Sequence, residues 1–412
     1  MPYGVFLIFL TLGTHGYCYV YFEWESKVIG TKVSENHVNL GVLLLIWKEN
    51  EYLGPGQSKE KEKKRTNEGL HHCIDVKVAD DGGNCKKQGL YAKAKTWQKL
   101  YSVMCSSYSS TNVFDTGNYT TDLLRVQSES YTPNNIPPPK PLLIATPLQD
   151  GEFPLLLFLH GYLLYNSFYS QLIQHVASHG FIVIAPQLYT AAGPDTSDEI
   201  HSVAAITNWL SKGISKFLPP NVRPNLSKLA LGGHSRGGKT AFALALRKLN
   251  ITTDLKFSAL IGVDPVDGMD KGKQTPPPVL TYVPNSFDID MAVMIIGSGL
   301  GEVKRNPLFP PCAPKGVNHE NFFNECKKPA WYFVAKDYGH SDMLDDDTNG
   351  IRGKATYCLC KNGESRKPMR SFVGGVIVAF LKAYLHDENG DLFAVRDMHV
   401  SLPVEIKSDS FV

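Results

Sequence analysis

The chain is organised around the segment LSKLALGGHSRGGKTAFALAL, residues 226–246. Within it, Lys228–Leu231 is a short apolar run with β character, and an alanine-rich helical pattern follows Ser235. The turn between them reads GHSRG, residues 233–237. A strand, a glycine-rich turn and a helix in direct succession are the setting in which Gly-x-Ser-x-Gly forms a nucleophile elbow. We therefore predict such an elbow here, with Ser235 as the nucleophile.

The glycines of this turn have a physical reason. A serine on a sharp strand-to-helix turn adopts a strained backbone conformation, and side chains two residues to either side would collide with the turn. The turn lifts the Oγ of Ser235 clear of the sheet. It also leaves the N–H of Arg236 free at a helix N-terminus, where negative charge is stabilised. Because the bare motif also arises by chance, the prediction depends on the flanking strand and helix.

The composition narrows the class of protein. The chain has 412 residues, and its 42 Lys and Arg against 40 Asp and Glu indicate no nucleic-acid partner. A hydrophobic content of 43% supports a sizeable core. Eight cysteines at this length do not make a disulfide scaffold, and without C-x₂-C pairs we expect no metal site. Cys312 with Cys326, and Cys358 with Cys360, are each either a disulfide or a pair of free thiols, and the sequence does not decide between these.

Residues 1–103 lack the pattern of the remainder. The stretch VFLIFLTLG (5–13) has the length of a signal-peptide core, but no basic segment precedes it and no small-residue cleavage site follows. VNLGVLLLIW (38–47) is too short to span a bilayer, and SKEKEKKR (58–65) is typical of a solvated charge run. We expect 1–103 to be a disordered or non-native extension, with a targeting segment as the weaker alternative. Residues 104–412 are expected to form the working domain, with no transmembrane segment.

From Asn112 onwards, apolar strands alternate with amphipathic helices. Apolar runs bounded by turn residues predict strands at 112–127 (a strand pair with a turn at 116–117), 141–147, 153–159, 181–187, 228–231, 257–264, 291–299 and 330–337. Helical spacing predicts helices at 167–178, from Asp195 or Ser197 to about residue 217, after Ser235, and at 369–385. Runs that are apolar throughout are typical of parallel strands buried on both faces. The sequence therefore predicts an α/β fold, a mostly parallel sheet covered by helices on both faces, with functional residues at the carboxyl ends of its strands.

A serine hydroxyl needs a base that takes its proton, and we predict that His340 is this base. The segment KDYGH ends the last buried strand and opens a glycine-containing loop, C-terminal to Ser235 as this architecture requires. An ordinary surface-loop histidine is the alternative. His160 and His234 each adjoin a glycine and are better interpreted as packing beneath the site.

The acid of the site is expected to be Asp264. It ends the strand after the elbow, and Pro265 directs the chain outward immediately after it. An aspartate that only caps its own loop is the alternative role. In this architecture the acid more often follows the next strand, where the sequence offers Glu302. Further candidates are Asp267, Asp337 and Asp342.

Two backbone donors are needed to stabilise an oxyanion. We predict the N–H of Arg236 and the N–H of Tyr162, which follows the His160-Gly161 turn; a plain glycine-containing turn is the alternative for the latter. The segment 264–290, rich in Pro and Gly, is either a surface loop or part of an apolar wall around the ligand. Its candidate wall residues are Pro276–Pro278, Val279, Leu280, Tyr282, Val283 and Phe287.

From about Asn112 to Ala394, the chain resembles the plant chlorophyllases, serine esterases of the α/β-hydrolase superfamily. The motifs that carry the resemblance are GHSRGG (233–238), FLHGYLLYNSFYSQL (158–172), IGVDPVDG (261–268), YGHSDMLDDD (338–347) and SRKPMRSFVGG (365–375). Carried over residue by residue, the resemblance implies a triad of Ser235, Asp264 and His340. MCSSYSSTNVFDTG (104–117) looks like the start of a family member without a long plastid transit peptide.

The resemblance implies hydrolysis of the phytyl ester of chlorophyll to chlorophyllide and phytol, without a cofactor; any magnesium belongs to the substrate. A general carboxylesterase or lipase is one alternative, and a non-catalytic hydrolase-fold receptor for an apolar ligand is another. The expected partners are chlorophyll and, transiently, pigment-bearing membranes. The sequence leaves the oligomeric state open, and the compartment open between the chloroplast and the cytosol or endomembrane surface.

Overall fold

The computed structural model describes residues 112–129 and 136–411, together with four short strands nearer the N-terminus. Those four strands form a sheet of their own in the order β2-β1-β3-β4. Their bounds are Val5–Leu12 (β1), Cys18–Glu23 (β2), Leu43–Ile46 (β3) and Val76–Lys77 (β4). The rest of 1–103 lies outside the described residues, so the expectation for that segment stays a prediction.

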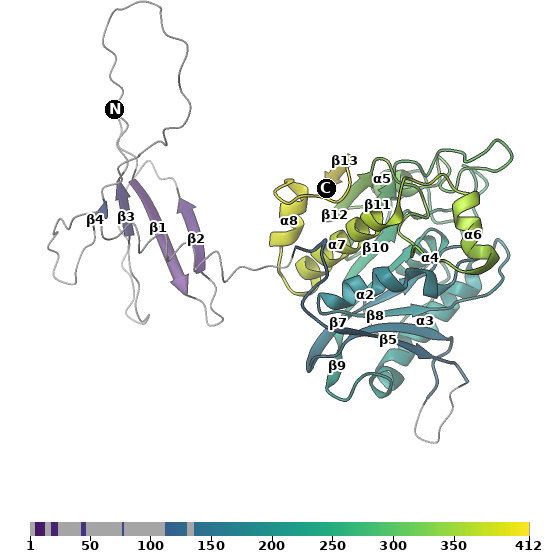
Figure 1. The fold of residues 1–412 in the computed structure, drawn as a ribbon, viewed down its shortest axis with the longest axis horizontal. Helices are drawn as coiled ribbons and strands as arrows, with labels where there is room; N and C mark the ends of the chain where they lie inside the picture. Colours follow the sequence, from purple (N-terminus) through teal and green to yellow (C-terminus); the bar gives the residue numbers. More distant parts are fainter. Residues whose placement is uncertain are drawn as a thin grey trace, which may run out of the picture. The chain divides into compact units, whose positions relative to one another are not determined.

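A nine-stranded sheet organises the described part of the chain from residue 112 onwards, in the order β13-β12-β11-β10-β9-β7-β8-β6-β5 (Figure 1). The strands are Thr121–Val126 (β5), Leu142–Pro147 (β6), Gly151–Leu159 (β7), Ile182–Pro186 (β8), Val222–His234 (β9), Ala259–Val263 (β10), Ala292–Ser298 (β11), Ala330–Ala335 (β12) and Ile406–Phe411 (β13). From β8 to β12 every neighbouring pair is parallel, and the outer pairs at both edges are antiparallel. The predicted mostly parallel sheet is confirmed.

Helices cover both faces of this sheet (Figure 1). One face packs against α2 (Ser170–Ser178), α7 (Arg366–Leu385) and α8 (Gly390–Arg396). The other packs against α3 (Ser197–Gly213), α4 (Arg236–Ala245) and α5 (His319–Glu325). Alternate residues of β7 enter the two cores, Leu156 and Phe158 on the first face, Leu155 and Leu157 on the second. Both faces are therefore buried, which is why the strand is apolar throughout.

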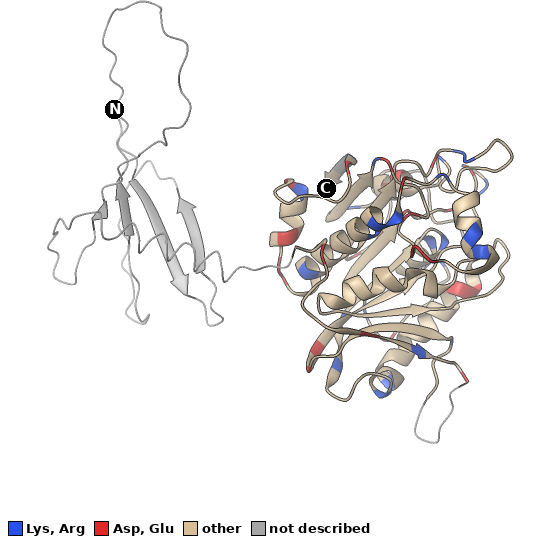
Figure 2. Ribbon diagram, viewed as in Figure 1, with Lys and Arg blue, Asp and Glu red and all other residues tan. Residues whose placement is uncertain are grey.

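The remaining helical segments are short. They are the 3₁₀ turns η1 (Asn166–Tyr169) and η2 (Ile214–Lys216), and α6 (Gly350–Cys358). Basic and acidic residues are interspersed along the helices and loops (Figure 2), in keeping with a net charge of +2.

Two local predictions were wrong. Residues 112–127 hold one strand, β5, because the first half of the segment forms turns that bond to the end of α2. There, the N–H of Gly117 donates to Ser178 Oγ at 2.8 Å, and β5 pairs with β6 instead. The strand before the elbow is also longer than the predicted 228–231, since β9 begins at Val222.

Helix α7 is a core helix. Among the described helices it is long and apolar enough to cross a membrane by length and composition, but 78% of its apolar window is buried inside the domain. Phe372 and Phe380 are fully buried against the sheet. Its apolar character thus serves packing within the domain.

Candidate active site

The predicted strand, turn and helix of the elbow are present. Ser235 lies between the end of β9 and the first residue of α4, with φ 55° and ψ −122°. A Cβ on Gly233 would lie 2.5 Å from the carbonyl carbon of Gly237, and one on Gly237 would lie 2.4 Å from the carbonyl oxygen of Leu159. Contacts that short are not tolerated, so both positions require glycine.

The sheet brings the three predicted side chains together. Ser235 follows β9, Asp264 follows β10, and His340 lies in the loop after β12. Because these strands are parallel, their carboxyl ends share one edge. The Nε2 of His340 lies 2.8 Å from Ser235 Oγ, and its Nδ1 lies 2.7 Å from Asp264 Oδ2. All three residues are buried, with relative exposures of 0 to 7%.

Asp264 is held as a carboxylate. Burial alone would raise its pKa, but the hydrogen bond from His340, electrostatic interaction with His340 and His319, and the hydroxyl of Ser298 lower the pKa to about 2. The Ser298 hydroxyl donates to Oδ2, and His319 Nε2 lies 3.8 Å from Oδ1. Sequence reasoning missed both residues. The position of Ser298 at the end of β11 was a usable signal, whereas no local signal marks His319.

The alternative acids are engaged elsewhere. Glu302 accepts a 2.8 Å hydrogen bond from the side chain of Asn318. Asp267 lies 3.1 Å from the Nζ of buried Lys239. Asp342 accepts backbone N–H groups that brace its own loop, and Asp337 is exposed.

His234 and His160 are buried, as packing residues would be, but His234 also lines a cavity that opens at Ser235. Gly161 N–H donates to the hydroxyl of Tyr169 at 3.0 Å, and that hydroxyl lies 2.7 Å from His234 Nδ1. His234 Nε2 lies 2.8 Å from the carbonyl oxygen of His340, which only accepts, so Nε2 carries the proton. Burial lowers the pKa of His234 to about 3 and that of His160 to about 4, so both rings are neutral at pH 7. These hydrogen bonds connect Gly161, in the turn before Tyr162, through Tyr169 and His234 to the loop that carries His340.

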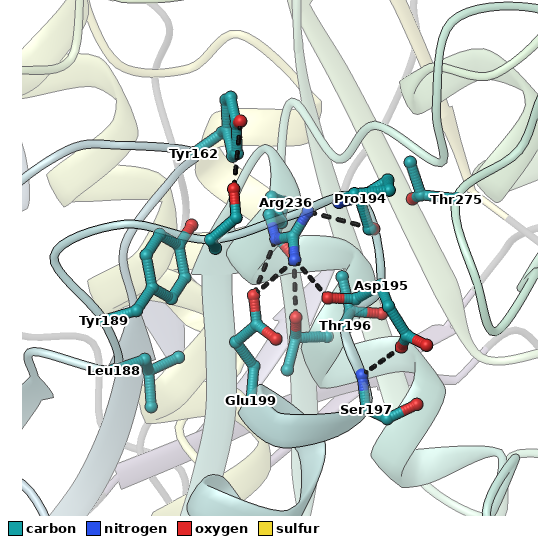
Figure 3. Close-up of polar contacts among 12 residues, drawn as sticks. Tyr162, Leu188, Tyr189, Pro194, Asp195, Thr196, Ser197, Glu199, Arg236 and Thr275 are labelled. Carbon is teal, nitrogen blue, oxygen red and sulfur yellow. Dashed lines mark hydrogen bonds and ion pairs between the residues drawn. The ribbon is translucent and has the colours of Figure 1, made fainter.

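The two predicted oxyanion donors flank Ser235. Arg236 is the first residue of α4, and Tyr162 follows the turn after β7. The roles of their N–H groups stay predictions. The side chain of Arg236 shapes the site (Figure 3): it bonds Glu199 at 2.7 Å and the carbonyl oxygens of Pro194 and Asp195 at 3.1 and 2.6 Å. Its guanidinium also lies 5.4 Å from the centre of the Tyr162 ring.

Two cavities of about 340 Å³ open at Ser235. The Met269 cavity is lined by Pro194, Arg236, Val266, Met269, Thr275 and Pro311, among others. The Ala355 cavity is lined by Leu163, Leu164, His340, Ile351, Ala355 and Leu359, among others. Tyr162 and Cys312 line both. Volumes of this size are typical of small-molecule sites.

The residues proposed for an apolar wall in the segment 264–290 do not line the cavities. Val279, Leu280 and Phe287 are buried in the core beneath α4 and α5, and Val283 is exposed. The same loop instead contributes Val266, Met269 and Thr275, which lie nearer its start. Part of the wall of the other cavity comes from α6, which the sequence did not single out.

A disulfide joins Cys312 to Cys360, with the two Cα atoms 5.5 Å apart. The pairings considered from spacing were wrong, because Cys326 and Cys358 are free thiols, the first buried and the second exposed. The bridge links the loop before α5 to the end of α6, beside both cavities. In the described part of the chain, no group of three or more His, Cys, Asp or Glu side chains could hold a metal ion.

Comparison with known proteins gives a consistent answer. A family model described as Chlorophyllase matches residues 109–412. The chain is 63% identical to Chlorophyllase-2 of Arabidopsis thaliana, over 73% of this chain and 98% of that protein. It is 48% identical to Chlorophyllase-1 of Arabidopsis thaliana, over 64% of this chain and 82% of that protein. It is 44% identical to Chlorophyllase-1, chloroplastic, of Citrus unshiu, over 73% of this chain and 88% of that protein.

Proposed function

The chain belongs to the chlorophyllase family, and from that premise we propose that it is a serine esterase that hydrolyses the phytyl ester of chlorophyll to chlorophyllide and phytol. The observation that carries the proposal is the position of His340, within hydrogen-bond distance of both Ser235 Oγ and Asp264 Oδ2. A nucleophile, a base and an ionised acid in this order are sufficient for acyl transfer.

In the proposed mechanism, Ser235 Oγ attacks the ester carbonyl carbon while His340 Nε2 takes its proton. Asp264, ionised because its pKa is about 2, stabilises the imidazolium that forms. The N–H groups of Arg236 and Tyr162 stabilise the oxyanion of the tetrahedral intermediate. The intermediate collapses to an ester between Ser235 and the acyl group, and phytol leaves with the proton of His340. The same ring then takes a proton from a water, which hydrolyses this ester, releases chlorophyllide and returns the proton to Ser235. The protein supplies side chains and backbone donors, and the magnesium belongs to the pigment.

The test of substrate is a direct comparison of esters. Each methylene buried on binding contributes about 0.8 kcal/mol, so a long-chain ester gains binding energy that a short one lacks. We expect detergent-solubilised chlorophyll a to be hydrolysed with a higher kcat/KM than short p-nitrophenyl esters, with chlorophyllide measured in the aqueous acetone phase. Brisk cleavage of short esters without chlorophyllide would indicate a general esterase. Absence of a product burst with an activated ester would indicate a receptor.

We also propose contact with pigment-bearing membranes. Ile351, beside the Ala355 cavity, is 88% exposed, so a membrane that delivers an apolar substrate to this cavity would meet its side chain; Leu308 is equally exposed. We expect Ile351→Ser to lower co-sedimentation with galactolipid vesicles; equal sedimentation would argue against this contact. Because Citrus relatives carry the word chloroplastic in their names, the chloroplast is one proposed compartment, beside the cytosol or endomembrane surface.

A further inference from the structure

We infer that the two cavities divide the ester between them: the Ala355 cavity binds the alcohol half and the Met269 cavity binds the acyl half. This assignment rests on the proposed ester hydrolysis. It names the specificity residues of each half, which the triad by itself leaves unspecified.

The position of the base decides which half lies where. The alcohol oxygen must accept the proton of His340 Nε2 as it leaves, so that oxygen has to lie within hydrogen-bond distance of the ring. His340 lines the Ala355 cavity, while the Met269 cavity is lined by Arg236 on the other side of Ser235. With the carbonyl carbon at Ser235 Oγ, the substituent on the histidine side is the alcohol, and the acyl substituent is directed to the Arg236 side.

The lining of the Ala355 cavity suits a branched hydrocarbon chain. Leu163, Leu164, Ala355 and Leu359 present aliphatic side chains to it. Arg352 also lines the cavity, but its guanidinium donates to the carbonyl oxygens of Leu163 and Thr190 and lies 4.8 Å from the centre of the Tyr165 ring. The charge of Arg352 therefore has partners in the protein, and its stem can contact an apolar ligand.

The cavity is also open at the point where a long chain would leave it. Ile351 lines the cavity yet is 88% exposed, so it lies at the mouth. An isoprenoid alcohol longer than the cavity can continue across Ile351 towards an apolar environment outside. On the other side, Pro194 and Arg236 line the Met269 cavity, and Arg236 donates to the carbonyl oxygens of Pro194 and Asp195. These bonds fix that wall in place against the acyl half.

The experiment measures how a filled cavity changes the preference for the alcohol. Ala355→Trp places an indole in the Ala355 cavity, Met269→Trp places one in the Met269 cavity, and Lys354→Trp adds the same ring to the exposed face of α6. For each variant we would measure kcat/KM for chlorophyll a and for the methyl ester of the same chlorophyllide. A second pair, farnesyl butyrate and ethyl butyrate, would be followed by titration of released butyric acid.

The assignment predicts that Ala355→Trp lowers the ratio of long-alcohol to short-alcohol kcat/KM at least tenfold in both pairs. A tenfold change corresponds to the loss of about two buried methylene groups, at roughly fourfold each. Met269→Trp should lower kcat/KM for both chlorophyllide esters and leave their ratio within about twofold, and Lys354→Trp should match the wild type.

An unchanged ratio in Ala355→Trp, or a tenfold change in Met269→Trp, would overturn the assignment. Melting temperatures check that each variant is folded, and the truncation Ile351→Ala, which should lower the same ratio in the same direction, substitutes for Ala355→Trp if that variant is unstable. If the wild type releases no chlorophyllide, the proposed substrate fails. The butyrate pair then still decides the assignment of the cavities.

Discussion

Replacement of the acid by its neutral isostere separates catalysis from folding. Asp264→Asn keeps the shape of the side chain, so the contact with Ser298 can persist, but it removes the charge that lies 2.7 Å from His340 Nδ1. An amide in that place can donate to Nδ1, which favours the tautomer whose Nε2 carries a proton and cannot accept one from Ser235. The imidazolium of the transition state also loses its counter-charge.

The size of the effect follows from this geometry. Loss of the anionic partner of a triad histidine lowers kcat by roughly 10⁴, or about 5 kcal/mol of transition-state stabilisation. The effect on folding is smaller. The pKa of Asp264 is lowered to about 2, from an ordinary value of 3.8, which corresponds to about 2 kcal/mol of native-state stabilisation at neutral pH. We therefore expect a loss of only a few degrees in Tm.

The assay measures kcat for hydrolysis of a short activated ester at pH 7, and thermal unfolding of the same samples gives Tm. Glu302→Gln is the matched control, because it is also a carboxylate-to-amide change, in the loop where this architecture more often places the acid. Glu302 contacts Asn318 and not the triad, so its kcat should stay within about threefold. If Glu302→Gln is the crippling change and Asp264→Asn retains more than a tenth of the activity, the role given to Asp264 is wrong.

Three further outcomes are expected. Burial lowers the pKa values of His160 and His234 to about 4 and 3, so below pH 6.5 the unfolded chain binds more protons than the folded one. The free energy of unfolding, measured with urea, should therefore fall by several kcal/mol between pH 7 and pH 4. An unfolding free energy that does not change with pH would contradict the burial of the two histidines as neutral rings. Tyr169→Phe leaves the N–H of Gly161 and a ring nitrogen of His234 without their partner, so Tm should fall by the equivalent of about 1–3 kcal/mol, and an unchanged Tm would refute the bonded chain. A chain beginning at Met104 should match the full chain in Tm and activity, since the family match starts at residue 109, whereas a Tm several degrees lower would show that the extension stabilises the domain.

The elbow and the two residues paired with it were predictable because each lies at the end of a buried strand. An apolar run marks the strand, a turn residue marks its end, and parallel strands bring such ends to one edge. Ser235, Asp264 and His340 all follow strands of the parallel set, at β9, β10 and β12. The positions of these three residues therefore do not depend on how the long loops fold.

The walls of the cavities were not predictable in this way. Val279 and Phe287 are apolar residues in a proline-rich loop. Their spacing does not predict that they pack beneath α4 and α5. Helix α6 is short, and its apolar residue Ile351 is 88% exposed and does not pack on the core. Its sequence therefore lacks the spacing of apolar residues that predicts an amphipathic helix. The Cys312–Cys360 bridge spans 48 residues of chain, a separation at which spacing does not choose among partners.

Whether Ser235 attacks the phytyl ester is tested by measuring chlorophyllide formation by the wild type and by Ser235→Ala. The substitution removes one buried oxygen next to His340 Nε2 and leaves the glycines of the elbow in place. We predict that kcat falls on the order of 10⁶ while Tm stays within about two degrees. A variant that folds normally and still releases chlorophyllide at a tenth of the wild-type rate would show that Ser235 is not the nucleophile.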